Sequence, residues 1–382
     1  MMRSQLSHAT RNAQIDIIRG VSILLVLFHH FNIAYRLNDT ALTRMVGWDA
    51  LRAVARNGNY GVTMFFVTSG YLITSHAYQR WNGLSHIDAK AFYGLRIARV
   101  APPLILLLAL VNALAWAGVA IFQNHAPMGT PVSFWIVNLA SLTFWMNVLI
   151  GAHGWANYPL SVLWSLSVEE VFYLAFPLLC LALRRESQLL AVWAVFIVIG
   201  PWYRFTHQAD EGQFLYGYFA CFDGIAIGCC TALLARRWTL SGLARTLLRL
   251  GTVSAMTFLY LYWPISQSNV FGVSAMALGT AILLLTSRGG EATLPALQWF
   301  GRLSYEFYLF HLIVLGMLRT QLPPPAVSGN EKLVLLAVYL LLSALVSMAI
   351  ARFYAEPLNR RIRRWLGPAR RPLIDNAERI NT

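Results

Sequence analysis

An arginine and a histidine stand at a helical spacing within the first long apolar stretch of the chain. Arg19 and His30 are separated by ten residues in a segment that begins at Ile15. An α-helix turns about 100° per residue, so eleven steps bring the two side chains to nearly the same direction, roughly 16 Å apart along the axis. Ionisable groups are costly inside a membrane and normally face a protein-lined cavity where they have a function. Arg19 and His30 are therefore predicted to share one functional stripe of a membrane helix.

Two later apolar stretches also carry groups suited to chemistry. Glu169 lies four residues before Tyr173, and Tyr308 lies three residues before His311, so each pair shares a helical face. A buried carboxylate that stays charged needs a cationic or hydrogen-bonding partner, and histidine is the usual base near neutral pH. A structural role is the alternative for each, because polar residues also join neighbouring membrane helices. Glu170 fits a carboxylate that interacts with the dipole at a helix start.

The composition indicates a membrane protein. Hydrophobic residues make up 57% of the 382 residues and charged residues only 12%, with a mean hydropathy of +0.54, whereas soluble domains carry about 25% charged residues. Several apolar stretches are long enough for a hydrocarbon core of roughly 30 Å. We therefore predict an all-α, polytopic membrane helix bundle. Its spans are expected at 15–35, 59–78, 100–122, 164–183, 188–203, 214–235, 246–264, 270–287, 298–318 and 333–355.

The segment 132–150 decides the topology. It is apolar but carries Asn138, Ser141, Thr143 and Asn147. If it does not cross, ten spans place both termini on one side, and that side holds 23 of the 30 Lys and Arg residues. Because basic residues concentrate on the cytoplasmic side, we predict ten spans, both termini cytoplasmic, and a re-entrant or interfacial 132–150. The seven basic residues expected on the opposite side are Arg36, Arg44, Arg52, Arg56, Arg204, Arg319 and Lys332.

This topology divides the chain into three parts: a cytoplasmic segment 1–14, a transmembrane domain 15–355 and a basic cytoplasmic tail 356–382. The first apolar stretch has no small-residue cleavage site, so we expect a retained span. The net charge of +14 is assigned to membrane orientation, and no nucleic-acid partner is expected. The four cysteines lie in apolar stretches without the spacing of metal ligands, so buried free thiols and no metal are expected.

Five motifs follow one another along the chain. They are Asp16 and Arg19 with His30, Phe65-Phe-Val-Thr-Ser-Gly-Tyr71, Phe92-Tyr-Gly-Leu-Arg-Ile-Ala-Arg-Val-Ala-Pro102, Trp164-Ser-Leu-Ser-Val-Glu-Glu-Val-Phe-Tyr173, and Gly301-Arg-Leu-Ser-Tyr-Glu-Phe-Tyr-Leu-Phe-His311. In order and spacing they resemble the acyltransferase-3 family of integral membrane O-acyltransferases, and the resemblance runs along almost the whole chain. One departure is Cys221-Phe-Asp223, which lacks the arginine that the family usually carries two residues before the aspartate.

The resemblance implies roles for the residues singled out above. Moving an acyl group from a thioester to a hydroxyl needs a base for the hydroxyl proton and a group that stabilises the oxyanion. His30 is the implied base or transient acyl carrier, and Glu169 orients the imidazole or contacts the acceptor. Arg19, Arg96 and Arg99 would bind the phosphates of acyl-CoA, although arginines at these places also serve as membrane anchors. Further cavity or acceptor candidates are Asp16, Ser69, Tyr173, Asp223, Tyr308 and His311.

These expectations combine into one predicted function. The chain is expected to be a multi-pass enzyme of the bacterial inner membrane that moves an acyl group, above all acetyl, from cytoplasmic acyl-CoA to a hydroxyl of a carbohydrate or glycolipid acceptor. An acyltransferase that modifies a small molecule or a lipid would use the same residues. A proton-coupled secondary transporter is the non-enzymatic alternative, because intramembrane His, Glu and Arg also mark proton relays, although no repeat typical of transporters is visible.

Overall fold

Long helices account for most of the chain that the computed structural model describes, namely residues 12–127, 129–238, 240–287 and 294–366. Within these ranges the chain forms no strand, which confirms the predicted all-α class. The predicted segment 1–14 and tail 356–382 lie mostly outside the described residues. The long helices are α1 (Ala13–Ala34), α4 (Asn59–Trp81), α5 (Ala89–Trp116), α8 (Leu163–Leu183), α9 (Glu186–Thr206), α11 (Tyr218–Leu234), α12 (Gly242–Tyr262), α13 (Ile265–Leu285), α15 (Ser304–Gln321) and α16 (Glu331–Ile350).

Short helices connect the long ones or extend them. They are α2 (Ala41–Val46), α3 (Trp48–Arg56), α6 (Phe134–Leu142), α7 (Met146–His153), α10 (Glu211–Tyr216), α14 (Pro295–Arg302) and α17 (Glu356–Trp365). Local signals set several helix ends. Asn12 and Asp88 accept hydrogen bonds from backbone N–H groups in the first turns of α1 and α5. Asn82 ends α4 in the left-handed conformation, with φ of 50°.

Each predicted span overlaps one of these long helices. Among the described residues, seven helical segments are long and apolar enough to cross a membrane: α1, α5, α8, α9, α10 with α11, α13, and α16 with α17. The other three predicted spans, α4, α12 and α15, have 23, 21 and 18 residues but are more polar. Because α4 and α15 turn polar side chains toward the protein interior, they need less apolar surface than a lipid-facing helix.

The ambiguous segment 132–150 forms two short helices. The α6 helix has nine residues and α7 has eight, with a break at Thr143–Trp145. A helix needs about 20 residues to cross the hydrocarbon core, so neither helix crosses alone. Tyr218 donates a hydrogen bond to the Phe144 carbonyl (2.7 Å) in the break, and Asn147 donates one to the Tyr216 carbonyl (3.2 Å). These two hydrogen bonds therefore tie the break and the start of α7 to α10 and α11.

The predicted span 298–318 is interrupted at Leu303, where α14 ends and α15 begins. The α14 helix lies against α1 at very short distance. A Cβ atom on Gly20 would come within 2.0 Å of the Leu297 carbonyl oxygen, and one on Gly301 within 1.8 Å of the Asp16 carbonyl oxygen. These glycines allow two backbones to touch, as small residues do between membrane helices. The contact fixes the starts of α1 and α15 relative to each other.

The α4 and α11 helices cross at the centre of the bundle through another pair of glycines. A Cβ atom on Gly70 would lie 2.0 Å from the Ile225 carbonyl oxygen, and one on Gly228 would lie 2.1 Å from the Val67 carbonyl oxygen. Larger residues at these positions would force the helices apart. Gly70 follows Ser69 directly, so this crossing also fixes where the Ser69 hydroxyl lies.

A buried ion pair joins α9, α11 and α13. Arg204 Nη2 lies 2.7 Å from Asp223 Oδ2, and both side chains are fully buried. Ser274 of α13 donates to the same carboxylate oxygen and accepts from Arg204, both at 2.6 Å. Arg204 was counted among the basic residues of the opposite side, and the structure shows that its guanidinium is enclosed by the bundle. The pairing offsets the cost of burying each charge.

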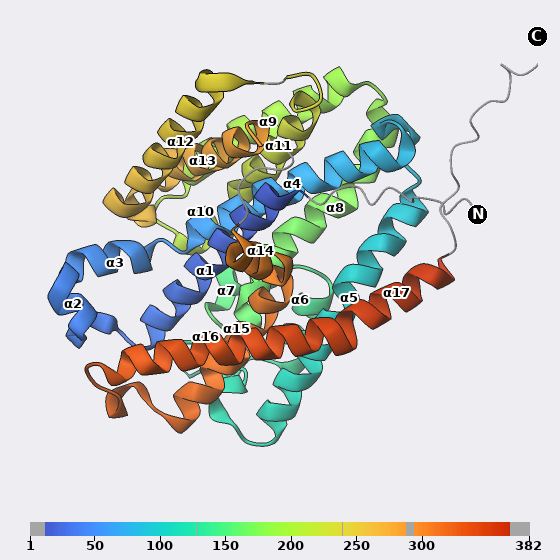
Figure 1. Ribbon diagram of the computed structural model, residues 1–382. Helices are drawn as coiled ribbons and strands as arrows, with labels where there is room; N and C mark the ends of the chain where they lie inside the picture. Colours follow the sequence, from blue (N-terminus) through green and yellow to red (C-terminus); the bar gives the residue numbers. More distant parts are fainter. Residues whose placement is uncertain (1–11, 128, 239, 288–293, 367–382) are drawn as a thin grey trace, which may run out of the picture.

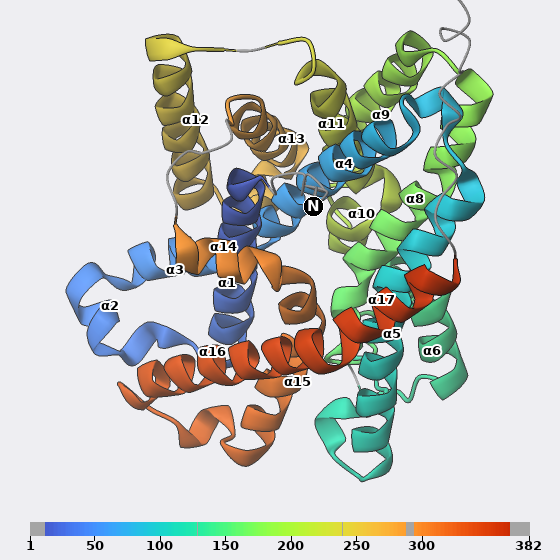
Figure 2. The ribbon, with the colours of Figure 1, turned by 45° about the vertical axis from the view of Figure 1, so that its right-hand side comes forward.

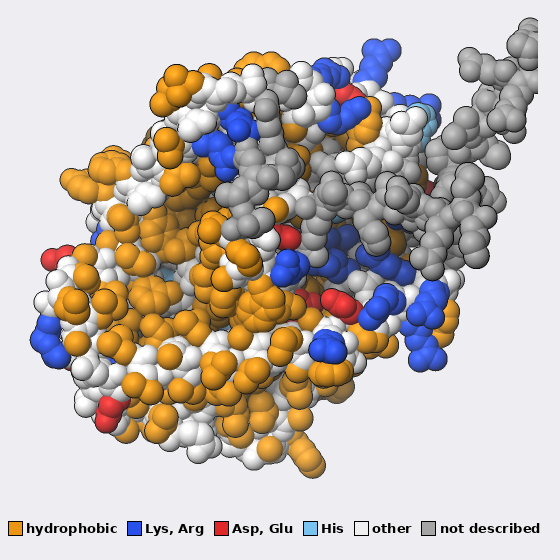
Figure 3. Space-filling view, in the orientation of Figure 1, with side chains coloured by type: hydrophobic (Ala, Val, Ile, Leu, Met, Phe, Trp, Pro, Cys, Tyr) orange, Lys and Arg blue, Asp and Glu red, His pale blue; other side chains and the backbone are white. Residues whose placement is uncertain are grey.

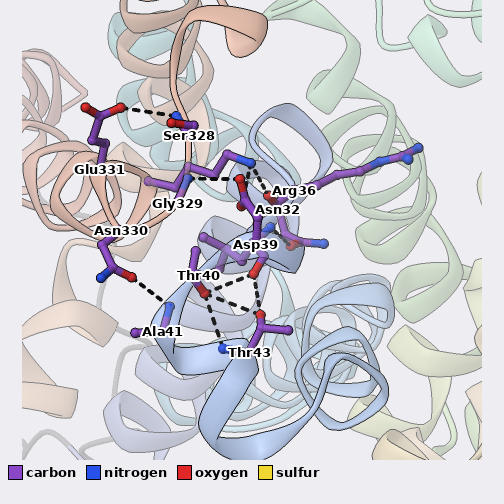
Figure 4. A network of polar contacts seen from close by, with 12 residues as sticks. Asn32, Arg36, Asp39, Thr40, Ala41, Thr43, Ser328, Gly329, Asn330 and Glu331 are labelled. Atoms are coloured by element: carbon purple, nitrogen blue, oxygen red, sulfur yellow. Dashed lines mark hydrogen bonds and ion pairs between the residues drawn. The ribbon is translucent and has the colours of Figure 1, made fainter.

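A polar network joins the end of α1 to the start of α16 (Figure 4). The Lys332 ammonium donates to the Arg36 carbonyl (2.9 Å) and to Asp39 Oδ1 (2.7 Å), and the Gly329 N–H donates to Asp39 Oδ2 (2.9 Å). Asn330 accepts a hydrogen bond from the Ala41 N–H at 2.7 Å. The hydrogen bond from Lys332 holds the pKa of Asp39 below its usual value. The network fixes the connection between the two helices on this side of the molecule.

The α16 and α17 helices form one long rod across a side of the molecule (Figures 1 and 2). They are continuous through a π-helical segment, Ala351–Ala355, and α17 then lies beside α5. Single π-helical turns are often found at functional sites. The rod brings the basic helix α17 next to α5, the early helix that carries both Arg96 and Arg99.

Candidate active site

A large cavity of about 1360 Å³ opens among α1, α4, α5, α8, α15 and α17. Figure 3 shows Lys and Arg side chains gathered around a hollow on the face that carries α17. Pockets for drug-sized ligands usually measure about 300–1,000 Å³, so this cavity has room for a larger molecule. Eight of the residues predicted for the site line it: Asp16, Arg19, Ser69, Arg96, Arg99, Glu169, Tyr173 and Tyr308.

The wall of the cavity holds a hydrogen-bonded cluster around Glu169. Ser69 of α4 and Tyr173 of α8 both donate to Glu169 Oε1, the tyrosine at 2.7 Å. Arg96 of α5 lies 3.6 Å from the same oxygen, and its guanidinium lies over the Tyr173 ring, 3.9 Å from the centroid. Ser69, Tyr173 and Arg96 therefore surround one oxygen of the Glu169 carboxylate. The i, i+4 spacing of Glu169 and Tyr173 had predicted their shared face.

Glu170 has a different role from the one expected. It is buried, and its Oε1 accepts a hydrogen bond from Arg96 Nη2 at 2.5 Å. The helix-start interpretation is wrong, because α8 begins at Leu163, nearly two turns earlier. Glu170 is thus the main partner of Arg96, and of the two carboxylates only Glu169 lines the cavity. The spacing of residues within one helix could not predict this contact between Arg96 of α5 and Glu170 of α8.

A pair of histidines joins α1 to α15. His30 Nδ1 lies 3.3 Å from His311 Nε2, with ring centroids 5.0 Å apart. His311 Nδ1 lies 3.0 Å from the Phe307 carbonyl oxygen and 2.9 Å from that of Tyr308. Carbonyl oxygens only accept hydrogen bonds, so His311 Nδ1 carries a proton and His311 Nε2 accepts.

The same reasoning assigns the neutral tautomer of His30. His30 Nδ1 lies 3.0 Å from the Val26 carbonyl oxygen and also faces His311 Nε2, and both of these atoms accept. The proton of His30 is therefore on Nδ1, which leaves a lone pair on Nε2. An imidazole with a free Nε2 is arranged as a base. His29 instead bonds to the Ala55 carbonyl at 2.6 Å and packs against α3.

Tyr308 separates the histidine pair from the large cavity. The Tyr308 hydroxyl lines the cavity, accepts a hydrogen bond from Ser165 (2.6 Å) and donates one to the Val162 carbonyl (3.0 Å). Its ring lies 6.1 Å from that of His311. His30 and His311 do not line the cavity, so the expectation that Arg19 and His30 share one pocket holds only for Arg19.

Asp223 does not line the large cavity either. Its carboxylate is held by Arg204 and Ser274, and it borders a separate void of about 20 Å³. The arginine absent from the segment before Asp223 is supplied in space by Arg204 of the neighbouring helix. Asp223 thus lies in a buried ion pair, apart from the large cavity.

The sequence analysis missed several residues of the cavity. His76 and Arg80 of α4, Tyr305 of α15, Ser165 of α8 and Arg363 of α17 all line it. Arg80 and Arg363 were predicted only as signals of membrane orientation, and such signals do not indicate where α17 packs. The described lining contains five arginines against two carboxylates, Asp16 and Glu169. A cavity of this charge favours an anionic ligand.

Comparison with known proteins agrees with the motifs. The family model described as "Acyltransferase domain" matches residues 12–352. The chain is 23% identical over 333 residues to peptidoglycan O-acetyltransferase OatA of Listeria monocytogenes, covering 79% of this chain and 49% of that protein. It is also 23% identical to the putative peptidoglycan O-acetyltransferase YrhL of Bacillus subtilis, covering 79% of this chain and 48% of that protein.

A putative O-acetyltransferase of Staphylococcus aureus is likewise 23% identical, with 80% of this chain and 51% of that protein covered. The chain thus spans about half the length of the curated relatives it matches. No solved structure matches it. Because the family model covers nearly all of the bundle described above, from the start of α1 to the π-helical segment, the chain belongs to the acyltransferase-3 family of membrane proteins.

Proposed function

We propose that the protein is an O-acetyltransferase that moves an acetyl group from acetyl-CoA to a hydroxyl of a saccharide acceptor. Family membership supports the reaction class, and relatives named as peptidoglycan O-acetyltransferases support a saccharide acceptor. The arginine-lined cavity supports a donor that carries phosphates, because guanidinium groups bind phosphate in bidentate fashion. The bacterial cytoplasmic membrane is the proposed location, since acetyl-CoA is then available on one side.

One observation carries this proposal. A single cavity collects Arg19, Arg96 and Arg99 at its basic end, and it reaches Tyr308, directly beside the His311–His30 pair. A donor with its phosphates on the arginines would point its thioester toward Tyr308. The base with a free Nε2 lies directly behind that tyrosine, and the acceptor hydroxyl would reach both the thioester and His30 when the Tyr308 side chain turns aside.

The proposed reaction proceeds through a tetrahedral intermediate. His30 Nε2 takes the proton of the acceptor hydroxyl while the hydroxyl oxygen bonds to the thioester carbonyl carbon. The developing oxyanion needs a hydrogen-bond donor, and the Ser165 hydroxyl at that end of the cavity would supply one by turning its proton from Tyr308 to the oxyanion. The carbon–sulfur bond then breaks, and the CoA thiolate takes the proton from His30. His311 Nε2 keeps His30 Nδ1–H in place throughout.

Replacement of His30 by alanine tests the proposal. The variant and the wild type are purified in lipid nanodiscs, and transfer of labelled acetyl from acetyl-CoA to peptidoglycan fragments is measured. Loss of a general base lowers kcat by about 100-fold or more. The matched control is His29→Ala, on the same helix but bonded to the Ala55 carbonyl, which is expected to keep most of the activity.

Two outcomes would contradict the proposed function. Undiminished transfer by a folded His30→Ala protein would remove His30 from the mechanism. Absence of any transfer or thioester cleavage by the wild type, with several saccharide acceptors, would remove the acyltransferase assignment itself. If His30 is a carrier instead of a base, acid quenching of the wild type during turnover traps labelled acetyl on the protein.

A further inference from the structure

A group of basic side chains at the mouth of the cavity has no role in the reaction described so far. Arg80 lies in the last turn of α4, His76 one turn before it, and Arg363 comes from α17. All three line the cavity and are exposed at its entrance. We call these three residues the entrance cluster.

The two arginines of the entrance cluster differ from Arg96 and Arg237 in their lack of acidic partners. Among the described residues, no carboxylate lies within ion-pair distance of Arg80 or Arg363, whereas Arg96 is paired with Glu170 and Arg237 with Glu186. Arg363 experiences repulsion from Arg80 and from the nearby Arg99. Like charges held together without counter-charges are unfavourable, and a bound anion removes that cost.

The fold holds Arg363 at this place through specific contacts. A Cβ atom on Gly94 of α5 would lie 2.8 Å from a Leu366 methyl group, so the glycine lets the end of α17 pack closely on α5. Asn359, one turn earlier on α17, accepts a hydrogen bond from Arg363 Nε at 2.6 Å. The hydrogen bond fixes one edge of the guanidinium and leaves its two terminal nitrogens for a ligand.

The position of the cluster suits one particular end of the proposed donor. Arg80 lies about three helical turns from Ser69 along α4, roughly 16 Å, so the cluster is far from the proposed site of transfer. Trp81 and Phe92 line the cavity next to it. Both rings are buried, with Phe92 stacked on Phe176 and the Arg80 guanidinium over Trp81, so they form the wall that holds the cluster in place.

We propose that Arg80 and Arg363, with His76, bind the 3′-phosphate on the adenosine end of the acyl-CoA donor. This proposal rests on the proposed function, in which Arg19, Arg96 and Arg99 remain for the diphosphate. The site would give the enzyme selectivity for CoA over donors that lack the 3′-phosphate. Arginine is suited to this task because its planar fork forms two parallel charge-assisted hydrogen bonds with a phosphate group.

Binding of CoA and of 3′-dephospho-CoA to the full chain in nanodiscs of neutral lipid tests the proposal. Calorimetry is expected to show that the wild type binds CoA about 10- to 100-fold more tightly, since charge-assisted hydrogen bonds to one phosphate are lost. Arg80→Gln and Arg363→Gln should each reduce this ratio, and the double variant should bring it close to one. Their affinity for 3′-dephospho-CoA should match that of the wild type.

Arg360→Gln provides the matched control. Arg360 lies on α17 and is exposed like Arg363, but it does not line the cavity, so this variant should keep the wild-type ratio. A wild type that binds the two ligands equally would overturn the inference, and so would a double variant that keeps the full ratio. Either result would overturn the 3′-phosphate site and leave the proposed use of acyl-CoA intact. No binding of either ligand would instead count against the proposed function.

A second set of measurements distinguishes a nucleotide phosphate from a lipid headgroup phosphate as the ligand of the entrance cluster. The same measurements are repeated in nanodiscs that contain phosphatidylglycerol. If the entrance cluster binds lipid headgroups, the CoA affinity of the wild type falls in these discs and that of the double variant does not. This result, combined with an unchanged CoA selectivity ratio in neutral discs, would replace the nucleotide assignment with a lipid one.

Discussion

At the scale of single residues, the structure separates groups that the sequence placed together. Arg19 and His30 lie on one stripe of α1, but only Arg19 lines the cavity, because Tyr308 of α15 stands between the cavity and His30. Spacing along one helix predicts which side chains share a face and not what a second helix puts in front of them. The contact between His30 and His311 joins positions 281 residues apart, so no local pattern predicts it.

His311 is expected to act as a positioning residue for His30. Replacement of His311 by alanine removes one of the two acceptors of His30 Nδ1–H and leaves only the Val26 carbonyl, so the imidazole is held less firmly in its orientation. We expect kcat to fall at least about tenfold, with KM for acetyl-CoA nearly unchanged and with a shifted pH profile of kcat/KM. His311→Gln offers an amide oxygen at a similar place and should recover part of the activity.

A purely structural role for His311 would give another pattern. Both variants would then lose thermal stability together, and the pH profile of the remaining activity would keep its wild-type shape. Recovery by glutamine without any change in the pH profile of the alanine variant would contradict the positioning role.

At the scale of helices, the apolar stretches predicted the elements well, and the departures have physical reasons. The span expected at 298–318 is broken at Leu303 because α14 packs its backbone against α1 through Gly20 and Gly301. Arg204, counted among the basic residues of the opposite side, is buried because it meets Asp223 of α11. Hydropathy describes the preference of a segment for lipid, and it does not describe pairings between two helices.

The ion pair between Arg204 and Asp223 gives a prediction at this scale. Arg204→Ala or Asp223→Asn alone leaves an uncompensated buried group among α9, α11 and α13, and such changes typically cost about 3–5 kcal/mol. We expect a large fall in the thermal unfolding temperature in detergent. The double variant Arg204→Met with Asp223→Leu removes both polar groups and should recover much of the loss.

The control for this prediction is donor binding. Neither residue lines the large cavity, so the recovered double variant should bind CoA like the wild type. Single variants that unfold at the wild-type temperature would show that the pair does not hold the three helices together.

At the scale of the whole molecule, the distribution of charge and the cavity belong together. The cavity lies where the start of α1, the end of α4, the start of α5 and α17 meet, and the predicted topology places all four on the cytoplasmic side. The basic residues there were predicted as orientation signals, and Arg19, Arg96 and Arg99 also as donor-binding groups. Five arginines of the described chain line the cavity, and only the arrangement of helices shows that Arg80 and Arg363 join the other three.

The topology itself is testable through added cysteines. With both termini cytoplasmic, a cysteine at Arg52 on α3 should react with a membrane-impermeant maleimide added to intact spheroplasts, and one at Arg361 on α17 should react only in inverted vesicles. Background labelling is expected to be low, because Cys180, Cys221 and Cys229 are buried and Cys230 is partly buried. Labelling of both positions from the same side would contradict the ten-span arrangement and the proposed cytoplasmic donor site.

The position of α17 in the chain has a consequence for biosynthesis. Arg363 follows the last predicted span, so the ribosome releases it only after all the helices that surround the cavity. A partly translated chain in the membrane would therefore lack one wall of the donor entrance. Such a chain would hold the acyl-CoA donor more weakly than the finished protein, and full donor affinity would come only with the assembled whole.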